Sequence, residues 1–170
     1  MTDQAPAPFD KSKHERSEFS CGEESLDRWL KEQAGQAQKK DATRTYVVAD
    51  EHDRIIGYYS LCAFSVKTEG APPAMKVGRY PIPAVLLARL AVEEREQGSG
   101  LGASLLLDAF SVAASVADAI GARMLVVHAL HEKAARYYEA NGFKAFEQDP
   151  LTLYLPMQDI RESLRVAHEG

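Results

Sequence analysis

The sequence predicts an α+β (α/β layered) fold built around a mixed sheet. Three observations lead to this class: β-type runs fill residues 43–66, a near-continuous apolar run fills 85–92, and a long helical pattern covers 105–120. A strand hairpin followed by strand, helix and further strands is typical of a layered fold whose sheet is mixed.

Length and composition restrict the class of protein further. The chain has 170 residues, of which 45% are hydrophobic and 26% charged, and these values fit one folded domain rather than a disordered chain. We expect a single domain over 1–170, with residues 1–8 as a disordered tail. The N-terminus lacks the features of a signal peptide, and we expect no apolar run that approaches the ~18 residues of a membrane span.

The two cysteines, Cys21 and Cys62, suit neither a disulfide framework nor a metal-type spacing. We therefore expect a reduced, cytoplasmic protein without a metal.

Charge is distributed unevenly along the chain. The net charge is −5, which excludes a globally basic nucleic-acid binder. Residues 28–44 nevertheless carry five basic side chains against two acidic ones, and residues 67–89 carry four against one. This segregation indicates either a solvated mixed surface or a basic face directed at a polyanion.

The N-terminal elements follow from local patterns. Residues 9–13 are expected to form a short edge strand. The Ser-x-x-Glu spacing of residues 20–23 is typical of a capping box and predicts the start of a helix. Apolar residues then recur at three- and four-residue steps, which predicts an amphipathic helix of about four turns. These residues are Leu26, Trp29, Leu30, Ala34 and Ala37.

A hairpin, a loop and a central strand come next. Two β-type runs, 43–49 and 54–66, flank a polar turn and predict an antiparallel hairpin. Residues 67–83 contain four of the eight prolines, which indicates an ordered loop. The apolar run 85–92 predicts a buried central strand.

Helices and strands alternate in the C-terminal half. A helix is expected through 105–120, ended by Gly121, and a second one over 131–141. The remaining predicted elements are strands at 124–129, 143–146 and 151–155 and a terminal helix at 158–167.

A glycine-rich loop, Gly98-Ser99-Gly100-Leu101-Gly102, lies between the apolar strand and the long helix. Glycines allow a tight turn and close approach of a ligand, and the free N–H groups of a helix's first turn favour an anion such as a pyrophosphate. The loop lacks the Lys-Ser/Thr of a P-loop and the βαβ context of a dinucleotide site. The alternative interpretation is that the glycine loop binds no ligand and only connects the strand to the helix.

Two motifs together resemble the GNAT acyl-CoA N-acyltransferase superfamily. Gln97-x-x-Gly100-x-Gly102 is similar to its Arg/Gln-x-x-Gly-x-Gly/Ala motif, and Tyr138-Glu-x-x-Gly-Phe143 is similar to its later Tyr-Glu-x-x-Gly-Phe motif. The resemblance covers residues 43–156. It implies the GNAT fold, with a mixed, mostly antiparallel sheet of six to seven strands flanked by about four helices. It also implies acetyl-CoA as cosubstrate.

A narrower resemblance covers nearly the whole chain. The segments 19–22, 26–30, 43–47, 57–61, 81–83 and 87–92 are similar to GNAT-type toxins of type II toxin–antitoxin systems. This resemblance implies acetylation of the amino group of aminoacyl-tRNA and a ribbon-helix-helix antitoxin as partner, and we also expect a homodimer. Glu93-Glu94 departs from the Asp that usually follows the strand in that family.

Acyl transfer to an amine needs a bound donor, a neutral amine and a proton for the departing thiolate. The resemblance assigns the general acid to Tyr138, with packing in the core as the alternative. It assigns the donor to the end of the central strand and the glycine loop. The donor-binding candidates are Leu90, Ala91, Val92, Gln97, Gly98, Ser99, Gly100, Leu101, Gly102 and Ala103.

For the remaining side chains that could react or titrate, we expect structural rather than catalytic roles. Glu93 and Glu94 are expected to be solvated turn carboxylates, and no general base is predicted. His128 and His131 are expected to be polar loop or cap residues. Cys62 is expected in the core and Tyr137 in packing.

Basic residues of the first helix and the central loop are the candidates for tRNA phosphates. They are Lys31, Lys39, Lys40, Arg44, Arg79 and Arg89. Two other functions stay open: a GNAT enzyme acting on a small amine or a protein N-terminus, and a module that binds acyl-CoA or an antitoxin without turnover.

Overall fold

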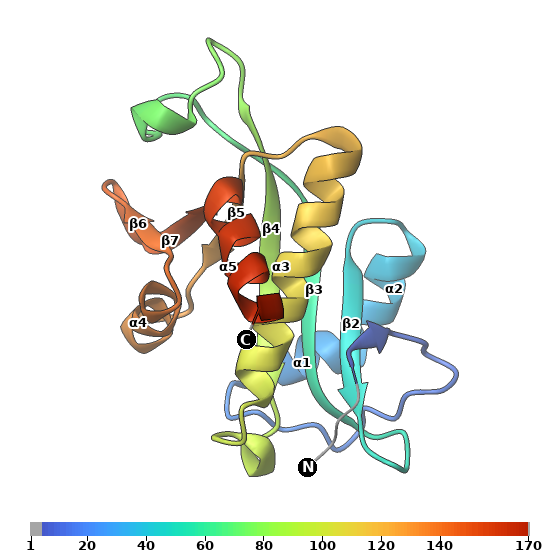
Figure 1. The fold of residues 1–170 in the computed structure, drawn as a ribbon. Coiled ribbons are helices and arrows are strands. Elements are labelled where there is room, and N and C mark those ends of the chain that lie inside the picture. The colour runs from blue at the N-terminus through green and yellow to red at the C-terminus, as the bar shows by residue number, and fades with distance from the viewer. Residues whose placement is uncertain (1–4, 170) are drawn as a thin grey trace. The chain divides into compact units, whose positions relative to one another are not determined.

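The structure, a computed structural model, describes residues 5–169. Within these residues seven strands form one sheet in the order β1-β2-β3-β4-β5-β7-β6, accompanied by five α-helices (Figure 1). The strand pairs with a defined register are antiparallel except β4 with β5, which is parallel. The predicted mixed, mostly antiparallel sheet is confirmed, with one helix more than expected.

The strands are β1 (Ala7–Pro8), β2 (Arg44–Ala49), β3 (Ile55–Val66), β4 (Ile82–Val92), β5 (Met124–His128), β6 (Lys144–Phe146) and β7 (Asp149–Pro156). The helices are α1 (Glu24–Glu32), α2 (Ala34–Lys39), α3 (Leu101–Ile120), α4 (Glu132–Ala140) and α5 (Met157–Glu169), with short 3₁₀ helices η1 (Pro73–Met75) and η2 (Glu94–Glu96).

The chain divides into two compact units. The first contains the chain up to Cys62 together with Ala88–Ala109, and the second contains Ala63–Leu87 together with the chain from Phe110 onward. Strands β3 and β4 and helix α3 each supply a segment to both units. Each unit is therefore described by itself.

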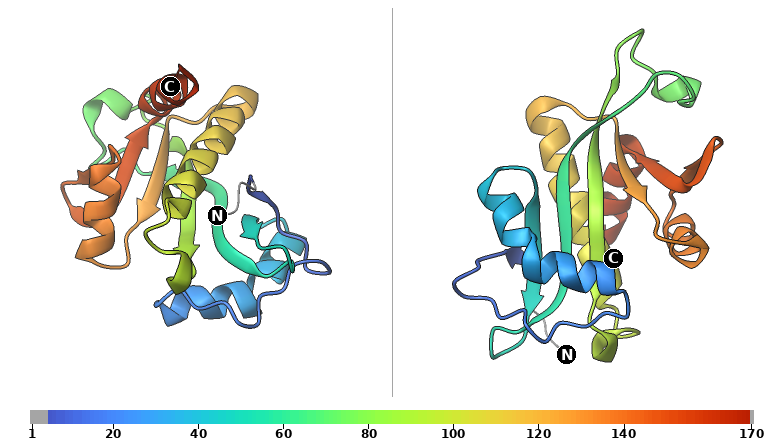
Figure 2. Two further views of the ribbon diagram at one scale, coloured as in Figure 1. Left: turned by 60° about the horizontal axis from the view of Figure 1, so that its bottom comes forward. Right: turned by 180° about the vertical axis from the view of Figure 1, so that it is seen from behind.

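In the first unit β3 separates two packing faces, because successive side chains of a strand point to opposite sides. The ring of Tyr58 stacks on Trp29 of α1, with 6.1 Å between ring centroids, and its hydroxyl donates to the carbonyl of Leu26 at 2.7 Å. The hydroxyl of Tyr59 donates to the carboxylate of Asp108 on α3. Helices α1 and α2 lie on one side of β2 and β3 (Figure 2).

Gly57 of β3 allows the start of α3 to approach the strand closely. A Cβ at this position would lie 2.9 Å from the side chain of Leu105 and 3.2 Å from that of Leu101. Any larger residue would push the first turns of α3 away from β3. The absence of a side chain at Gly57 therefore helps to fix where the N-terminus of α3 lies in this unit.

In the second unit β5 lies between two strands. It pairs in parallel with β4 from Ala84↔Met124 to Leu87↔Val127, and antiparallel with β7. Its four apolar residues are buried, and the strand expected over 124–129 is confirmed as β5. Arg161 of α5 forms an ion pair with Asp118 of α3 at 2.9 Å.

Helix α3 is 20 residues long and apolar enough, by length and composition, to cross a membrane, so the expectation that no apolar run approaches this length is wrong. One such helix is weak support for a membrane protein, since the core helix of a soluble protein meets the same criterion. Leu105, Leu106, Ala109, Phe110 and Ala113 of α3 are buried inside the protein. Their spacing gives α3 one core-facing stripe, as in a helix of a globular domain.

The N-terminal elements differ from the sequence-based expectation. The edge strand is Ala7–Pro8 rather than 9–13, so the end of the predicted tail pairs with Val47 and Tyr46. Residues 1–4 lie outside the described part of the chain. Residues 9–13 instead form a turn in which the carboxylate of Asp10 accepts from the backbone N–H and the hydroxyl of Ser12.

The predicted capping box at Ser20 is wrong. Gly22 has φ +97, and α1 begins at Glu24 without a side-chain cap. The Ser20 hydroxyl donates to Glu94 at 2.9 Å instead. The expected four-turn helix is also divided at Gln33, whose φ of −123 lies outside the helical region.

Helix α2 is attached to the sheet edge by one side chain. The amide of Gln38 donates to the carbonyl of Phe9 at 2.7 Å and accepts from the N–H of Thr45 at 3.1 Å. Gln38 thus connects α2 to β2, whereas α1 ends before Gln33.

Candidate active site

The glycine loop of the first unit occupies the turn between η2 and α3. Gly98 and Gly100 have φ +87 and +93, a region that favours glycine. A Cβ at either position would meet no atom within 4 Å, and Gly98, Ser99 and Gly100 are exposed. The loop backbone is therefore open to a ligand, and the first N–H groups of α3, which have no acceptor within the helix, lie directly after it.

The loop is held in place by Gln97, the first residue of the motif. Its side-chain amide donates to the carbonyl of Cys21 at 2.8 Å and to that of Val92 at 2.9 Å. One amide group thus joins the end of β4 to the segment before α1. The Ser20 and Glu94 pair reinforces this connection, since the N–H of Glu94 also donates to the carbonyl of Ser20 at 2.9 Å.

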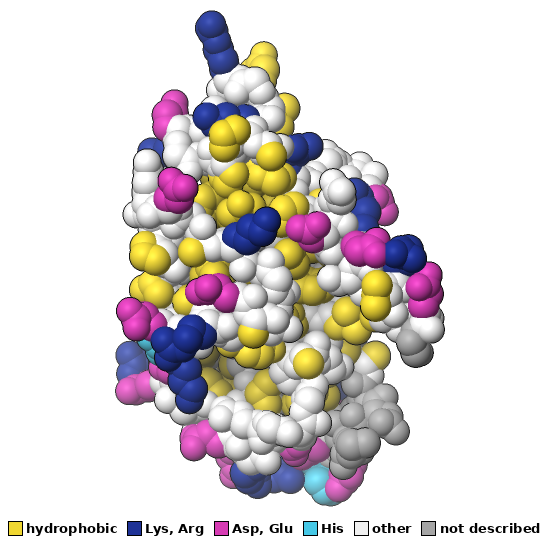
Figure 3. Space-filling model, turned by 60° about the vertical axis from the view of Figure 1, so that its left-hand side comes forward, with side chains coloured by type: hydrophobic (Ala, Val, Ile, Leu, Met, Phe, Trp, Pro, Cys, Tyr) yellow, Lys and Arg dark blue, Asp and Glu magenta, His cyan; other side chains and the backbone are white. Residues whose placement is uncertain are grey.

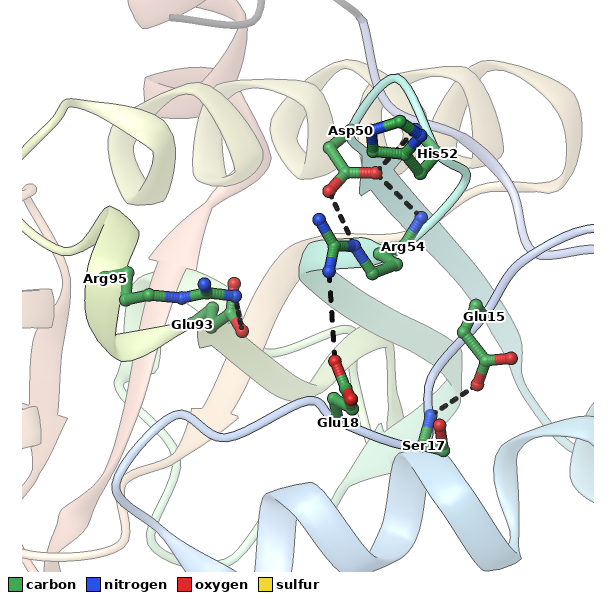
Figure 4. A network of polar contacts seen from close by, with 8 residues as sticks. All are labelled: Glu15, Ser17, Glu18, Asp50, His52, Arg54, Glu93 and Arg95. Atoms are coloured by element: carbon green, nitrogen blue, oxygen red, sulfur yellow. Dashed lines mark hydrogen bonds and ion pairs between the residues drawn. The ribbon is translucent and has the colours of Figure 1, made fainter.

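The two carboxylates after β4 are both engaged. Glu93 is 7% exposed, its N–H donates to the carbonyl of Ile56, and its carboxylate pairs with Arg95 at 2.9 Å. The expectation that Glu93 is solvated is therefore wrong, because the residue is buried and its carboxylate is paired with Arg95. Figure 4 shows this pair together with a second network in which Arg54 contacts Asp50 and Glu18.

The end of β4 carries the other donor-binding candidates. Pairing with β5 ends at Leu87, and β4 continues to Val92. Ala91 is buried, while Leu90 and Val92 are partly exposed. Backbone groups of a strand that extends beyond its partner can pair with an extended ligand. The remaining candidates, Leu101, Gly102 and Ala103, form the first turn of α3.

Tyr138 belongs to the second unit and lies on the buried face of α4. The residue is 7% exposed, and its ring packs edge-on against Phe143 with 5.4 Å between centroids. Burial raises the pKa of its hydroxyl above the usual value, so the group stays protonated through the neutral range.

The hydroxyl of Tyr138 has no hydrogen-bond partner among residues 5–169. Among the described residues, the unpartnered side-chain polar atom that is fully shielded from solvent is Thr43 Oγ1. The Tyr138 oxygen also lacks a partner but is not shielded in this way, so it retains contact with solvent. A buried ring with an accessible, protonated hydroxyl suits a proton donor. Tyr137, the next residue, is 39% exposed and packs edge-on against Tyr138.

The two histidines have separate local roles. His131 caps α4, its Nδ1 accepting from the N–H of Ala134 at 3.2 Å, as predicted for a cap residue. His128 ends β5, and its Nδ1 lies 3.0 Å from the hydroxyl of Thr152. That hydroxyl donates to Asp149 at 2.6 Å, so it accepts from His128 and fixes the proton on Nδ1.

Sequence reasoning missed this arrangement of His128, Thr152 and Asp149. The signal that could have found it is the register of two strands, because His128 and Thr152 are opposite each other in β5 and β7. The hydrogen bond from Thr152 lowers the pKa of Asp149. The second ring nitrogen of His128 lies on an exposed side chain.

The candidate phosphate-binding residues have different environments. Lys39 and Lys40 are exposed at the end of α2 and form no ion pair within residues 5–169. Arg44 is engaged with Asp41 at 2.6 Å and with the carbonyl of Gln38. Lys31 is half-buried on α1, and Arg79 is exposed in the loop of the second unit.

Arg89 is the charged residue of the central strand. Its guanidinium carbon lies 4.1 Å from the centroid of the Trp29 ring, and burial lowers its pKa. Within residues 5–169 its guanidinium forms neither an ion pair nor a hydrogen bond. Its N–H donors are therefore available to a ligand.

An apolar strand that leads through an open glycine loop into the N-terminus of a long helix forms a site for an anionic group such as a pyrophosphate, as an acyl-CoA-dependent acyltransferase requires. The comparison with protein families agrees. Residues 42–145 match the family model described as an acetyltransferase (GNAT) domain. The chain belongs to the GNAT acetyltransferase family.

Relatives within this family share most of the chain. A protein of Mycobacterium tuberculosis named "tRNA-acetylating toxin" is 40% identical over 144 residues, which cover 84% of this chain and 86% of that protein. The solved structure of AtaT complexed with acetyl-methionyl-tRNAfMet is 28% identical, has a TM-score of 0.85, and the match covers 93% of this chain and 97% of that one.

A second solved structure contains further partners of the same relative. It is a mutant of the AtaT toxin bound to the C-terminus of the antitoxin AtaR and to acetyl-CoA. This structure is 27% identical with a TM-score of 0.81, and the match covers 93% of this chain and 96% of that one.

Proposed function

We propose that the protein transfers the acetyl group of acetyl-CoA to the α-amino group of aminoacyl-tRNA and blocks translation as the toxin of a type II toxin–antitoxin pair. The observation that supports this most is the 40% identity to a tRNA-acetylating toxin over most of both chains. The open glycine loop at the N-terminus of α3 supplies the physical basis for donor binding.

The donor is proposed to bind through backbone groups. The N–H groups of Gly98–Ala103 receive the pyrophosphate, because they belong to the loop and the first turn of α3 and can donate to an anion. Leu90, Ala91 and Val92 offer strand N–H and C=O groups to the pantetheine arm. Gln97 acts indirectly, by joining β4 to the segment at Cys21.

The transfer step requires one proton donor. The neutral amine attacks the thioester carbon, a C–N bond forms, and the C–S bond breaks with the electron pair leaving on sulfur. We assign to the Tyr138 hydroxyl the proton that the thiolate receives, while the amine releases its own proton to water. An α-amino group has a pKa of about 7.7–8.0 and is substantially neutral near pH 8, so a strong base is not required.

The two glutamates after β4 are poor bases in this structure. Glu93 is paired with Arg95, and Glu94 accepts from Ser20. Both carboxylates are better explained as parts of the scaffold that holds the glycine loop.

Phosphates of the acceptor are proposed to meet the free basic side chains. Lys39, Lys40, Arg79 and Arg89 lack internal ion pairs within residues 5–169, whereas Arg44 is already paired with Asp41. We further propose that residues 1–170 act as one cytoplasmic acetyltransferase domain. Its partners are a ribbon-helix-helix antitoxin and a second copy of the chain.

Acetylation of purified aminoacyl-tRNA from labelled acetyl-CoA tests the proposal. We expect turnover of aminoacyl-tRNA, and a KM that rises with salt by a log–log slope of about 0.7–0.9 per neutralised phosphate. The K39E/K40E variant should raise the KM for aminoacyl-tRNA and leave the KM for acetyl-CoA unchanged. Lys144→Glu, an exposed lysine of β6, is the matched control.

The alternative is a GNAT enzyme of a small amine or a protein N-terminus. Salt-insensitive kinetics, equal KM values for K39E/K40E and wild type, and efficient acetylation of a small amine would favour that alternative. Donor binding without turnover of either acceptor would favour a binding module.

A further inference from the structure

The loop between β3 and β4 in the second unit is held at residues 71–75 by buried side chains and hydrogen bonds. Ala71 and Met75 are buried in a cluster with Ile82 and Tyr154. The guanidinium of Arg123 donates to the carbonyls of Ala74 at 2.9 Å and Met75 at 3.4 Å. A loop attached in this way can hold its tip in a defined place.

The tip of this loop, residues 76–81, is exposed at every position. Its backbone is nevertheless ordered by local bonds. Val77 and Tyr80 form an isolated bridge around Gly78, whose φ is +61, and the hydroxyl of Thr68 donates to the carbonyl of Tyr80 at 2.7 Å. The Tyr80 side chain is 75% exposed, and within residues 5–169 it has neither a ring contact nor a hydrogen bond.

The segment that carries Tyr80 is rich in unpaired positive charge. The loop carries Lys67, Lys76 and Arg79 against Glu69, and none of the three basic side chains forms an ion pair within the described residues. Figure 3 shows Lys and Arg side chains beside hydrophobic ones on the projection at the top of the molecule. An exposed aromatic ring in the same loop as free cations matches a polyanion that also offers flat apolar rings, which is single-stranded nucleic acid.

A second copy of this chain fits the loop tip less well. Oligomers are commonly formed about a two-fold axis, which brings the same patch of both copies together. At this tip such a contact would place Arg79 and Lys76 near their own counterparts, and like charges repel.

We propose that the Tyr80 ring stacks on an unpaired nucleobase of the tRNA acceptor, and that Lys76 and Arg79 contact the phosphates beside it. The proposal rests on the proposed function and names the part of the substrate that this loop recognises. Stacking supplies affinity independent of charge, and the two cations supply the salt-dependent part.

Four substitutions of Tyr80 separate stacking from simple apolar contact. Tyr80→Ala and Tyr80→Leu should raise the KM for aminoacyl-tRNA about 5- to 150-fold, which corresponds to about 1–3 kcal/mol per stacked base. Tyr80→Phe and Tyr80→Trp should remain within about two-fold of wild type, because both keep a flat ring. The KM for acetyl-CoA and the turnover of a small amine should not change. Val166→Ala, at an exposed apolar position of α5, is the control.

Two physical readouts accompany the kinetics. In Tyr80→Trp the new indole should be quenched on titration with deacylated tRNA, after subtraction of the Trp29 signal measured in wild type. The salt slope of binding should stay the same in Tyr80→Ala and should fall by about 0.7–0.9 in Arg79→Gln if one phosphate contact is lost.

Each contrary result has a distinct meaning. A wild-type KM in both Tyr80→Ala and Tyr80→Leu would show that the ring does not contribute to binding and would overturn the proposal. A wild-type KM in Tyr80→Leu alone would show that any apolar side chain suffices and would overturn stacking as well. A change of mass in sedimentation on Tyr80→Ala would identify a subunit contact and overturn it as well. If wild type acetylates no tRNA but binds it in a manner that depends on the ring at position 80, the proposed function fails and stacking on RNA stands.

Discussion

The guanidinium carbon of Arg89 on β4 lies 4.1 Å above the ring centroid of Trp29 on α1. Trp29 in turn stacks on Tyr58, with 14° between the ring planes. The three side chains form a short column in the first unit, and its cation is half-buried without a carboxylate partner in the described chain. The aromatic face therefore orients Arg89 and leaves its N–H groups for a ligand.

The contact between Arg89 and Trp29 should be measurable as a coupling energy. A double-mutant cycle with Trp29→Leu and Arg89→Met should give about 0.5–2 kcal/mol from urea unfolding. The pair Arg16 and Phe9, at 5.7 Å, is an internal comparison for which we expect a smaller coupling. Equal coupling energies for both pairs would show that the shorter distance between Arg89 and Trp29 does not strengthen their contact.

Replacing Gly100 should block the donor without unfolding the protein. Gly100→Asp places a carboxylate where the pyrophosphate is proposed to bind, so acetyl-CoA affinity measured by calorimetry should be lost. Gly121→Asp is the matched control, because Gly121 also has a positive φ, +89, and open space around its missing side chain. Both variants should show a similar loss of stability from backbone strain. Retained affinity in Gly100→Asp would refute the assignment of the loop.

Removing the Tyr138 hydroxyl should slow the reaction and spare the fold. Tyr138→Phe keeps the contact with Phe143, so donor binding should persist while kcat falls by about 10²–10⁴-fold. Burial raises the pKa of Tyr138, so the wild-type rate should not decline through ionisation of this group below about pH 10. Tyr137→Phe is the control and should remain active. Full activity in Tyr138→Phe would leave Tyr138 as a packing residue.

The thiol of Cys21 should be unreactive in the native protein. Burial raises its pKa to about 12, so almost no thiolate is present near pH 8. Burial also raises the pKa of Cys62. Alkylation with iodoacetamide, followed by mass spectrometry, should label both residues slowly in the folded chain and rapidly in urea. Rapid labelling of native Cys21 would indicate that the segment around Gln97 opens in solution.

The free energy of unfolding should decrease in alkaline solution, because three buried tyrosines have a higher pKa in the folded than in the unfolded chain. Burial raises the pKa values of Tyr58, Tyr59 and Tyr138 in the folded state. A pKa that is higher in the folded than in the unfolded chain gives stability that is complete below the unfolded value, about 10, and is lost as pH rises through the folded value.

Urea unfolding at pH 8, 10 and 11 measures this loss. Tyr59→Phe should be less stable than wild type at pH 8, where the hydrogen bond to Asp108 is missing, and should lose less stability between pH 10 and 11. An equal loss in wild type and Tyr59→Phe would show that Tyr59 does not contribute to the alkaline transition.

Elements with local causes could be predicted from the amino-acid sequence. Branched and aromatic residues specify β2 and β3, Gly121 ends α3 with φ +89, and the apolar run specifies β4, because backbone preference and burial act over a few neighbouring residues. The glycine loop was recognisable for the same reason, since Gly98 and Gly100 adopt positive φ that few other residues accept.

The partners of the polar side chains, by contrast, depend on the packed chain. Ser20 has the spacing of a helix cap, yet it bonds to Glu94, 74 residues away, and Gln97 bonds to Cys21 at a separation of 76 residues. His128 finds Thr152 only through the register of β5 and β7. Hydrogen bonds between distant segments depend on how strands pair and helices pack, and no local pattern encodes that choice.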